Sequence, residues 1–105
     1  MERRALKRIP SDVKSSFFCN ETDYFGTITD ISENGMHIKT NNISFPIESL
    51  VDIVIEIKTM LLNVPVKICR LSKSGDVYDG IGVRVLHPVH EYLEYVKTLK
   101  SKLSI

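Results

Sequence analysis

The chain has 105 residues, of which 43% are hydrophobic and 26% are charged, so a single domain can bury a core without a metal or a disulfide. Its net charge is +1, but residues 1–8 carry four basic side chains and one acidic one, which leaves ten basic against twelve acidic residues elsewhere. A compact basic segment on a near-neutral body favours one small anionic ligand, whereas a long nucleic acid would favour a broad basic face.

Two further classes are disfavoured by the sequence. No apolar run approaches the roughly 20 residues of a membrane span, and no apolar segment follows the N-terminal charges, so we expect neither a membrane helix nor a signal peptide, and a cytoplasmic location. Cys19 and Cys69 lie outside any C-x-x-C or His/Cys cluster. We therefore expect two reduced thiols and no metal site.

The chain begins with a basic arm. Glu2 to Arg8 precedes Ile9-Pro10, and a proline favours an extended conformation for the residue before it. We therefore divide the chain into an arm, residues 1–10, and a single barrel domain, residues 11–105. Most basic N-terminal segments are simply disordered, so the arm acquires a function only if a partner for its arginines lies further along the chain.

The middle of the chain alternates apolar and polar residues, or is rich in β-branched and aromatic ones, between turn-forming segments. These patterns predict strands at about residues 13–19, 24–31, 36–40, 51–58, 62–71 and 78–86. Gly80 and Gly82 share one face of the last strand and either leave room there for a backbone or a ligand or mark a bulge or a corner of the barrel.

A helix is expected after the strands. Pro88 suits a first helical turn, and the apolar residues from Tyr92 to Leu103 recur at helical spacing, which predicts a helix over about residues 89–103. The three histidines have no metal-ligand neighbours at suitable spacing, and we give them no role. The fold class is therefore mainly β: a small six-stranded antiparallel β-barrel with a C-terminal α-helix.

One polar stretch stands out within this pattern. Asn34-Gly35 separates two strand-like runs, and both residues tolerate positive φ, which predicts a tight hairpin turn. Asp30 and Ser32 lie two residues apart, so in an extended strand they face the same side. A carboxylate and a hydroxyl are thus expected on one rim beside the turn.

These groups fit a guanine nucleotide when they are combined with Arg4 and Arg8. The Watson–Crick edge of guanine has two adjacent N–H donors that suit one carboxylate, and its O6/N7 edge accepts an arginine fork. Arginine also stacks on flat bases and pairs with phosphate oxygens.

At this point the sequence resembles the PilZ domain family, whose members are bacterial receptors for cyclic di-GMP. Arg4-x-x-x-Arg8 and Asp30-x-Ser32-x-x-Gly35 resemble its paired RxxxR and (D/N)xSxxG motifs, and residues 80–85 resemble its glycine-bearing late strand. The likeness covers nearly the whole chain. It implies that the arginines clamp phosphate and stack on guanine, that Asp30 and Ser32 read a guanine edge, and that Gly35 permits the turn.

The resemblance also carries expectations about partners. In the family, a basic residue at the position of Arg3 tends to accompany the binding of an intercalated ligand dimer. We expect the arm to become ordered when cyclic di-GMP binds, and an unidentified downstream protein to receive the signal. No cofactor and no catalytic activity are expected, since no catalytic constellation is present. Two alternatives remain: a PilZ-type protein-interaction module without nucleotide binding, and a small barrel that binds RNA or single-stranded DNA, which the strands' low Lys/Arg content disfavours.

Overall fold

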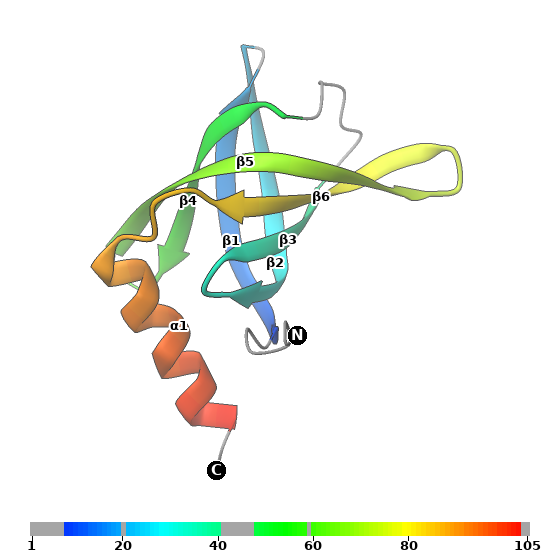
Figure 1. The fold of residues 1–105 in the computed structure, drawn as a ribbon. Coiled ribbons are helices and arrows are strands. Elements are labelled where there is room, and N and C mark those ends of the chain that lie inside the picture. The colour runs from blue at the N-terminus through cyan, green and yellow to red at the C-terminus, as the bar shows by residue number, and fades with distance from the viewer. Residues whose placement is uncertain (1–7, 20, 41–47, 59, 104–105) are drawn as a thin grey trace, which may run out of the picture.

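A computed structural model describes residues 8–19, 21–40, 48–58 and 60–103 of the chain. In this part, six antiparallel strands close into a barrel in the order β1-β2-β3-β6-β5-β4, and one helix follows them (Figure 1). The elements are β1 (Ile9–Cys19), β2 (Thr22–Ser32), β3 (Gly35–Thr40), β4 (Leu50–Ile57), β5 (Met60–Ser74), β6 (Val77–Val85) and α1 (His90–Leu103). The expected fold class is confirmed.

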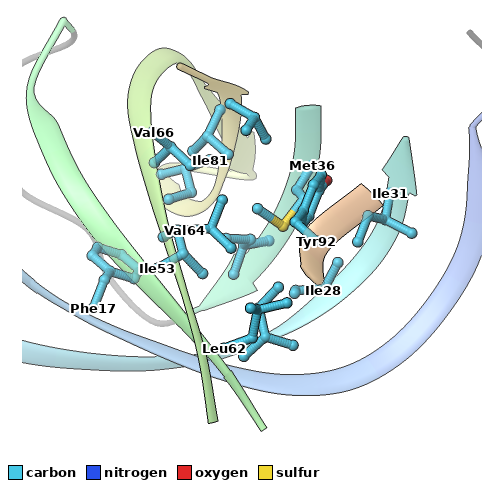
Figure 2. Packing of buried hydrophobic residues seen from close by; sticks show 14 of the residues in the cluster. Phe17, Ile28, Ile31, Met36, Ile53, Leu62, Val64, Val66, Ile81 and Tyr92 are labelled. Atoms are coloured by element: carbon cyan, nitrogen blue, oxygen red, sulfur yellow. The ribbon is translucent and has the colours of Figure 1, made fainter. Parts of the chain in front are cut away.

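The alternating residues form the barrel core. Ile53 and Ile55 of β4, and Val64 and Val66 of β5, are completely buried, and Ile53 lies directly opposite Val64 in the β4–β5 ladder. Figure 2 shows these inward side chains meeting those of the other strands in one cluster. Each fully buried side chain of this size contributes about 1.5–3 kcal/mol, so the strand pattern fixes which face of each strand turns inward.

The start of the barrel differs slightly from the expected division of the chain. β1 begins at Ile9, so the last two residues of the expected arm already pair with β2: Ile9 lies opposite Ile31, and Pro10 lies opposite Asp30. Ile9 is buried in the core. Arg8 is consequently held directly beside the first residue of a fixed strand.

The β2–β3 turn is built differently from the predicted one. Ser32 pairs with Gly35, so the two turn residues are Glu33 and Asn34. The predicted hairpin is confirmed, but among the described residues neither Asn34 nor Gly35 is one of those with positive φ. Gly35 instead starts β3, where a Cβ atom would lie 2.7 Å from the carbonyl oxygen of Val83 on β6. It therefore permits a close approach of two strands.

Helix α1 lies at the end of the barrel where the β2–β3 turn is found (Figure 1). Tyr92 and Val96 on one of its faces are completely buried in the core. Glu91 in its first turn and lysines in its last turn complement the helix dipole. Within the described ranges, no helix has the length and apolarity needed to cross a membrane.

Candidate functional site

Arg8 and Asp30 form the centre of the candidate site. Arg8 Nε donates a hydrogen bond of 2.8 Å to Asp30 Oδ1, and Arg8 Nη2 lies 2.5 Å from the same oxygen. The side chains are 47% and 36% exposed, and an ion pair so open to water contributes only about 0–1 kcal/mol. The pair therefore orients both groups at the surface without locking them together.

A β-bulge explains why Asp30 points outward. The β2–β3 register shifts between Ile28 and Asp30, which leaves Thr29 as the extra residue. Ile28 and Ile31 are both completely buried, while Thr29 and Asp30 between them are partly exposed. Two outward residues in succession are possible only because the bulge interrupts the strict alternation of the strand.

Asp30 begins a row of residues that runs across four strands. Asp30 lies opposite His37 on β3, His37 opposite Gly82 on β6, and Gly82 opposite Arg70 on β5. We call these four residues the polar row. Since neighbouring strands lie about 4.8 Å apart, the row spans about 14 Å of the barrel's outer surface.

The arginine at the far end of the polar row lies over a glycine. A Cβ atom at Gly82 would lie 3.3 Å from Arg70 Nη2, so the absent side chain makes room for the guanidinium. Arg70 is exposed and has no carboxylate partner in the described part of the chain. With Arg8 over Asp30, the row thus has a cationic fork at each end. The space that was expected beside Gly82 for a backbone or a ligand is filled by the Arg70 side chain, and the β5–β6 register shifts next to it, between Ile68 and Arg70.

His37 fills the middle of the row. Its Nδ1 lies 3.0 Å from the hydroxyl of Thr29, and its Nε2 lies 3.0 Å from the hydroxyl of Ser72. Burial lowers the pKa of His37, opposed by Asp30 and assisted by Arg70, Arg8 and Lys39. A neutral imidazole has one donor and one acceptor nitrogen, and a hydroxyl can match either. His37 is therefore held as a neutral ring between the two arginines.

His37 and Arg70 are the site residues that sequence reasoning missed. His37 is a lone histidine on a strand, and Arg70 is one cation in a strand that alternates regularly. The sequence signal for these two residues is the glycine pair Gly80 and Gly82, which leaves space on one face of β6. The His37 ring uses this space at Gly80, where a Cβ atom would lie 3.1 Å from it. What fills that space depends on the register of three strands.

Ser32 belongs to the motif turn, the name used below for residues 32–35. Its side chain is completely buried, and its hydroxyl donates a 2.8 Å hydrogen bond to Asn34 Oδ1. The expected rim with two outward polar groups therefore has only the carboxylate of Asp30. Ser32 fixes the conformation of the turn, and Gly35 brings the turn close to Arg8, whose Nη1 would lie 3.8 Å from a Cβ atom at Gly35.

Four of the six predicted site residues are thus brought together: Arg8, Asp30, Ser32 and Gly35. Arg3 and Arg4 lie outside the described residues. Across the described ranges, no group of three His, Cys, Asp or Glu side chains could hold a metal ion.

A cavity of about 420 Å³ opens elsewhere, beside β1, β2 and β4, and is lined by Lys14, Phe25 and Glu56 among others. None of its lining residues belongs to the polar row or to the motif turn. The candidate site is therefore identified by its side chains and not by a cavity: the polar row has Arg8 beside Asp30 at one end and Arg70 at the other.

Comparison with known proteins adds an independent observation. The family model described as "PilZ domain" matches residues 2–99. No curated protein matches the sequence significantly.

Three solved structures show the same fold. The PilZ domain of YcgR from Escherichia coli with c-di-GMP has a TM-score of 0.77 at 11% identity, covering 97% of this chain and 95% of that one. The Bacillus subtilis inhibitor of motility (MotI/DgrA) has a TM-score of 0.81 at 12% identity, covering 99% of this chain and 53% of that one. A K. pneumonia MrkH–c-di-GMP complex has a TM-score of 0.77 at 14% identity, covering 99% and 53%.

This chain spans about half the length of MotI/DgrA and of MrkH. The family match extends over almost the whole sequence and includes every residue of the candidate site. The chain therefore belongs to the PilZ domain family.

Proposed function

We propose that this chain is a non-enzymatic receptor for cyclic di-GMP, which it binds over the polar row and the motif turn. The observation that carries the proposal is the Arg8–Asp30 pair, in which residues 22 apart in sequence meet at the barrel surface beside Gly35. Membership of the PilZ family supports it, as do the neighbours YcgR and MrkH, whose structures contain c-di-GMP.

Asp30 is suited to recognise guanine. Its carboxylate accepts hydrogen bonds only, and the N1–H and N2–H groups of guanine are adjacent donors that one carboxylate can receive together. Adenine presents no such pair on its Watson–Crick edge. In this proposal, Asp30 supplies the selectivity for guanine, and Ser32 keeps the turn beside it in shape.

Arg8 is suited to the anionic part of the ligand. Its planar fork can pair with phosphate oxygens or with the O6/N7 edge of guanine, and its face can stack on a base. Because the Arg8–Asp30 pair is half exposed, exchanging part of it for ligand contacts costs at most about 1 kcal/mol. The ligand then gains a cation and a carboxylate that are already in place.

Arg70 and His37 extend this surface. Arg70 offers a second fork about three strand spacings from Asp30, and its lack of a carboxylate partner among the described residues leaves it available to a phosphate or a base. The neutral ring of His37 lies between the two forks, and Gly82 beneath the Arg70 guanidinium has no side chain that would displace it. A ligand with two flat bases and two phosphates matches such a surface better than a mononucleotide does.

The arm completes the proposal. Arg4 would add a second fork beside Arg8, and Arg3 would accompany uptake of an intercalated ligand dimer. Residues 2–8 have only Ala5 and Leu6 as apolar residues between their charges, so we expect this segment to have too little apolar surface to offset its ordering entropy alone. Ligand contacts would therefore order it, and this change would be received by a downstream protein. A cytoplasmic location also stays a prediction.

Isothermal titration calorimetry with cyclic di-GMP tests the proposal, with cyclic di-AMP and GTP as competitors. We expect selective binding that Arg8→Ala weakens about tenfold or more, because a charge-assisted hydrogen bond is lost. Lys97→Ala on the exposed side of α1 removes one positive charge away from the site and should leave binding unchanged. A folded protein that releases no heat with cyclic di-GMP would refute nucleotide binding and favour a PilZ-type protein-interaction module.

A further inference from the structure

Helix α1 contacts the motif turn at two points. The Tyr92 hydroxyl donates a hydrogen bond of 2.5 Å to the backbone oxygen of Ser32, and Lys100 Nζ donates one of 2.7 Å to Glu33 Oε2. Ser32 and Glu33 lie between Asp30 and Gly35 in sequence. The C-terminal helix therefore holds the segment that connects the residues assigned to the ligand.

Both contacts come from one face of the helix. Tyr92, Val96 and Lys100 recur every four residues, so they lie along one side of α1. Tyr92 and Val96 are completely buried, and Figure 2 shows Tyr92 in the same cluster as Ile31 and Met36. Ile31 precedes the motif turn and Met36 follows it, so the helix and the two residues that flank the turn belong to the same core.

Ser32 is held at three places. Its carbonyl accepts from Tyr92, its hydroxyl donates to Asn34, and its backbone pairs with Gly35. Burial raises the pKa of Tyr92 far above its ordinary value, so this hydroxyl keeps its proton and remains a donor. Of the three contacts, only the one to Tyr92 comes from outside the hairpin.

The second contact is weaker but also specific. The side chains of Lys100 and Glu33 are 35% and 32% exposed, which limits the strength of their ion pair. However, Glu33 Oε1 is buried and has no hydrogen-bond partner in the described part of the chain. The charge of Lys100 therefore compensates a carboxylate that is partly removed from water.

We propose that α1 is a positioning element of the nucleotide site, in which Tyr92 and Lys100 hold Ser32 and Glu33 so that Asp30 faces the ligand. This inference rests on the proposed function and adds a regulatory consequence. If docking of α1 increases ligand affinity by some factor, ligand binding must stabilise the docked helix by the same factor. The population of docked helix then increases when the ligand is bound.

Calorimetry of four variants tests the positioning role. Tyr92→Phe removes one hydroxyl and should weaken cyclic di-GMP binding about three- to tenfold, as expected for one hydrogen bond. Lys100→Met should weaken binding about two- to fivefold, in line with its half-exposed pair, and Lys100→Arg should restore it. Lys97→Met, on an exposed residue of the same helix, is the matched control and should have no effect.

Hydrogen exchange of the same proteins supplies the second readout. In the absence of ligand, Tyr92→Phe should accelerate exchange in residues 31–36 relative to the parent. With cyclic di-GMP, exchange in residues 90–103 of the parent should slow, because a ligand that binds better when the helix is docked must stabilise the docked helix. Exchange in residues 31–36 of Lys100→Met should be compared with the parent in the same way. Because Lys100 is partly exposed, this substitution does not disturb the core.

The outcomes separate this inference from the proposed function. If the parent binds cyclic di-GMP, but Tyr92→Phe and Lys100→Met bind equally well and helix exchange is unchanged by ligand, α1 is only a packing element and the receptor function stands. If the parent does not bind, the receptor function fails and the coupling to ligand fails with it. Exchange in residues 31–36 then still decides whether Tyr92 holds the turn.

Discussion

Replacing Gly35 by alanine is the substitution whose effect follows most directly from the structure. An ideal Cβ atom at this position lies 2.7 Å from the backbone oxygen of Val83, whereas ordinary contacts begin at 3.4 Å, so β3 and β6 must separate locally by about 0.7 Å. Forcing extra atoms into such a contact costs about 1–3 kcal/mol. For a domain of this size, each kcal/mol lowers the Tm by about 4–8 °C.

Gly26→Ala is the matched control for this strain. Its Cβ atom would lie 2.5 Å from the backbone oxygen of Lys39, which is also a collision with a backbone oxygen of the neighbouring strand. Gly26 pairs with Thr40, well along β3 from the motif turn. Both variants should therefore lose stability, but only Gly35→Ala displaces the turn that carries Ser32 and lies beside Arg8.

The assay is cyclic di-GMP titration at a temperature at which both variants are fully folded, alongside thermal unfolding. Gly35→Ala should weaken binding about three- to tenfold, the equivalent of one misplaced hydrogen bond, whereas Gly26→Ala should bind as the parent does. Equal affinities for the two variants would show that the closeness of the motif turn to β6 is unrelated to binding. A Gly35→Ala protein as stable as the parent would refute the strain argument itself.

Three further predictions concern Arg8 and two residues of the polar row. Arg8→Lys keeps the positive charge but loses the planar fork, so it should lower the affinity for cyclic di-GMP nearly as much as Arg8→Ala does. If Arg8→Lys binds as tightly as the parent, Arg8 contributes only its charge. Asp30→Asn should erode the preference for cyclic di-GMP over cyclic di-AMP, measured by competition titration, and an unaltered preference would remove Asp30 from guanine recognition. The pKa of His37 is lowered from 6.5, chiefly by burial. At pH values near and below 6.5 the unfolded chain therefore binds more protons than the folded protein does. The stability that is present above pH 6.5 should decline as the pH falls through that value. Urea unfolding of the parent and of His37→Gln at pH 7.5 and 5.5 checks this: the advantage of the parent should shrink at the lower pH, and a constant difference would exclude titration of His37.

Much of the fold could be predicted because burial leaves a clear periodicity. β4 alternates Ile53 and Ile55 with exposed or partly exposed residues, and those isoleucines are the completely buried ones. The helix was predictable from Tyr92 and Val96, which are buried at helical spacing. In both elements one side faces the core, so the spacing of apolar residues within the element itself predicts its structure.

The candidate site was less predictable because its geometry depends on contacts between distant strands. Gly35 looked like a turn glycine, but its requirement comes from Val83 on a strand nearly fifty residues later. Strand alternation alone cannot show that the hydroxyl of Ser32 is turned toward Asn34, and its contact with a guanine edge stays a prediction. Arg8 and Asp30 were identified from motif spacing, whereas their partners in the polar row required the register of β3, β6 and β5.

Cyclic di-GMP is proposed to bind over the polar row and the motif turn. Amide chemical-shift mapping by NMR tests this most directly, because one titration reports whether the ligand binds and where. We predict that the largest shifts fall at residues 30–37, Arg70 and Gly82, with residues 2–8 losing mobility as they become ordered. Shifts centred instead on the cavity beside Lys14, Phe25 and Glu56, with residues 30–37 unaffected, would exclude binding over the polar row and the motif turn.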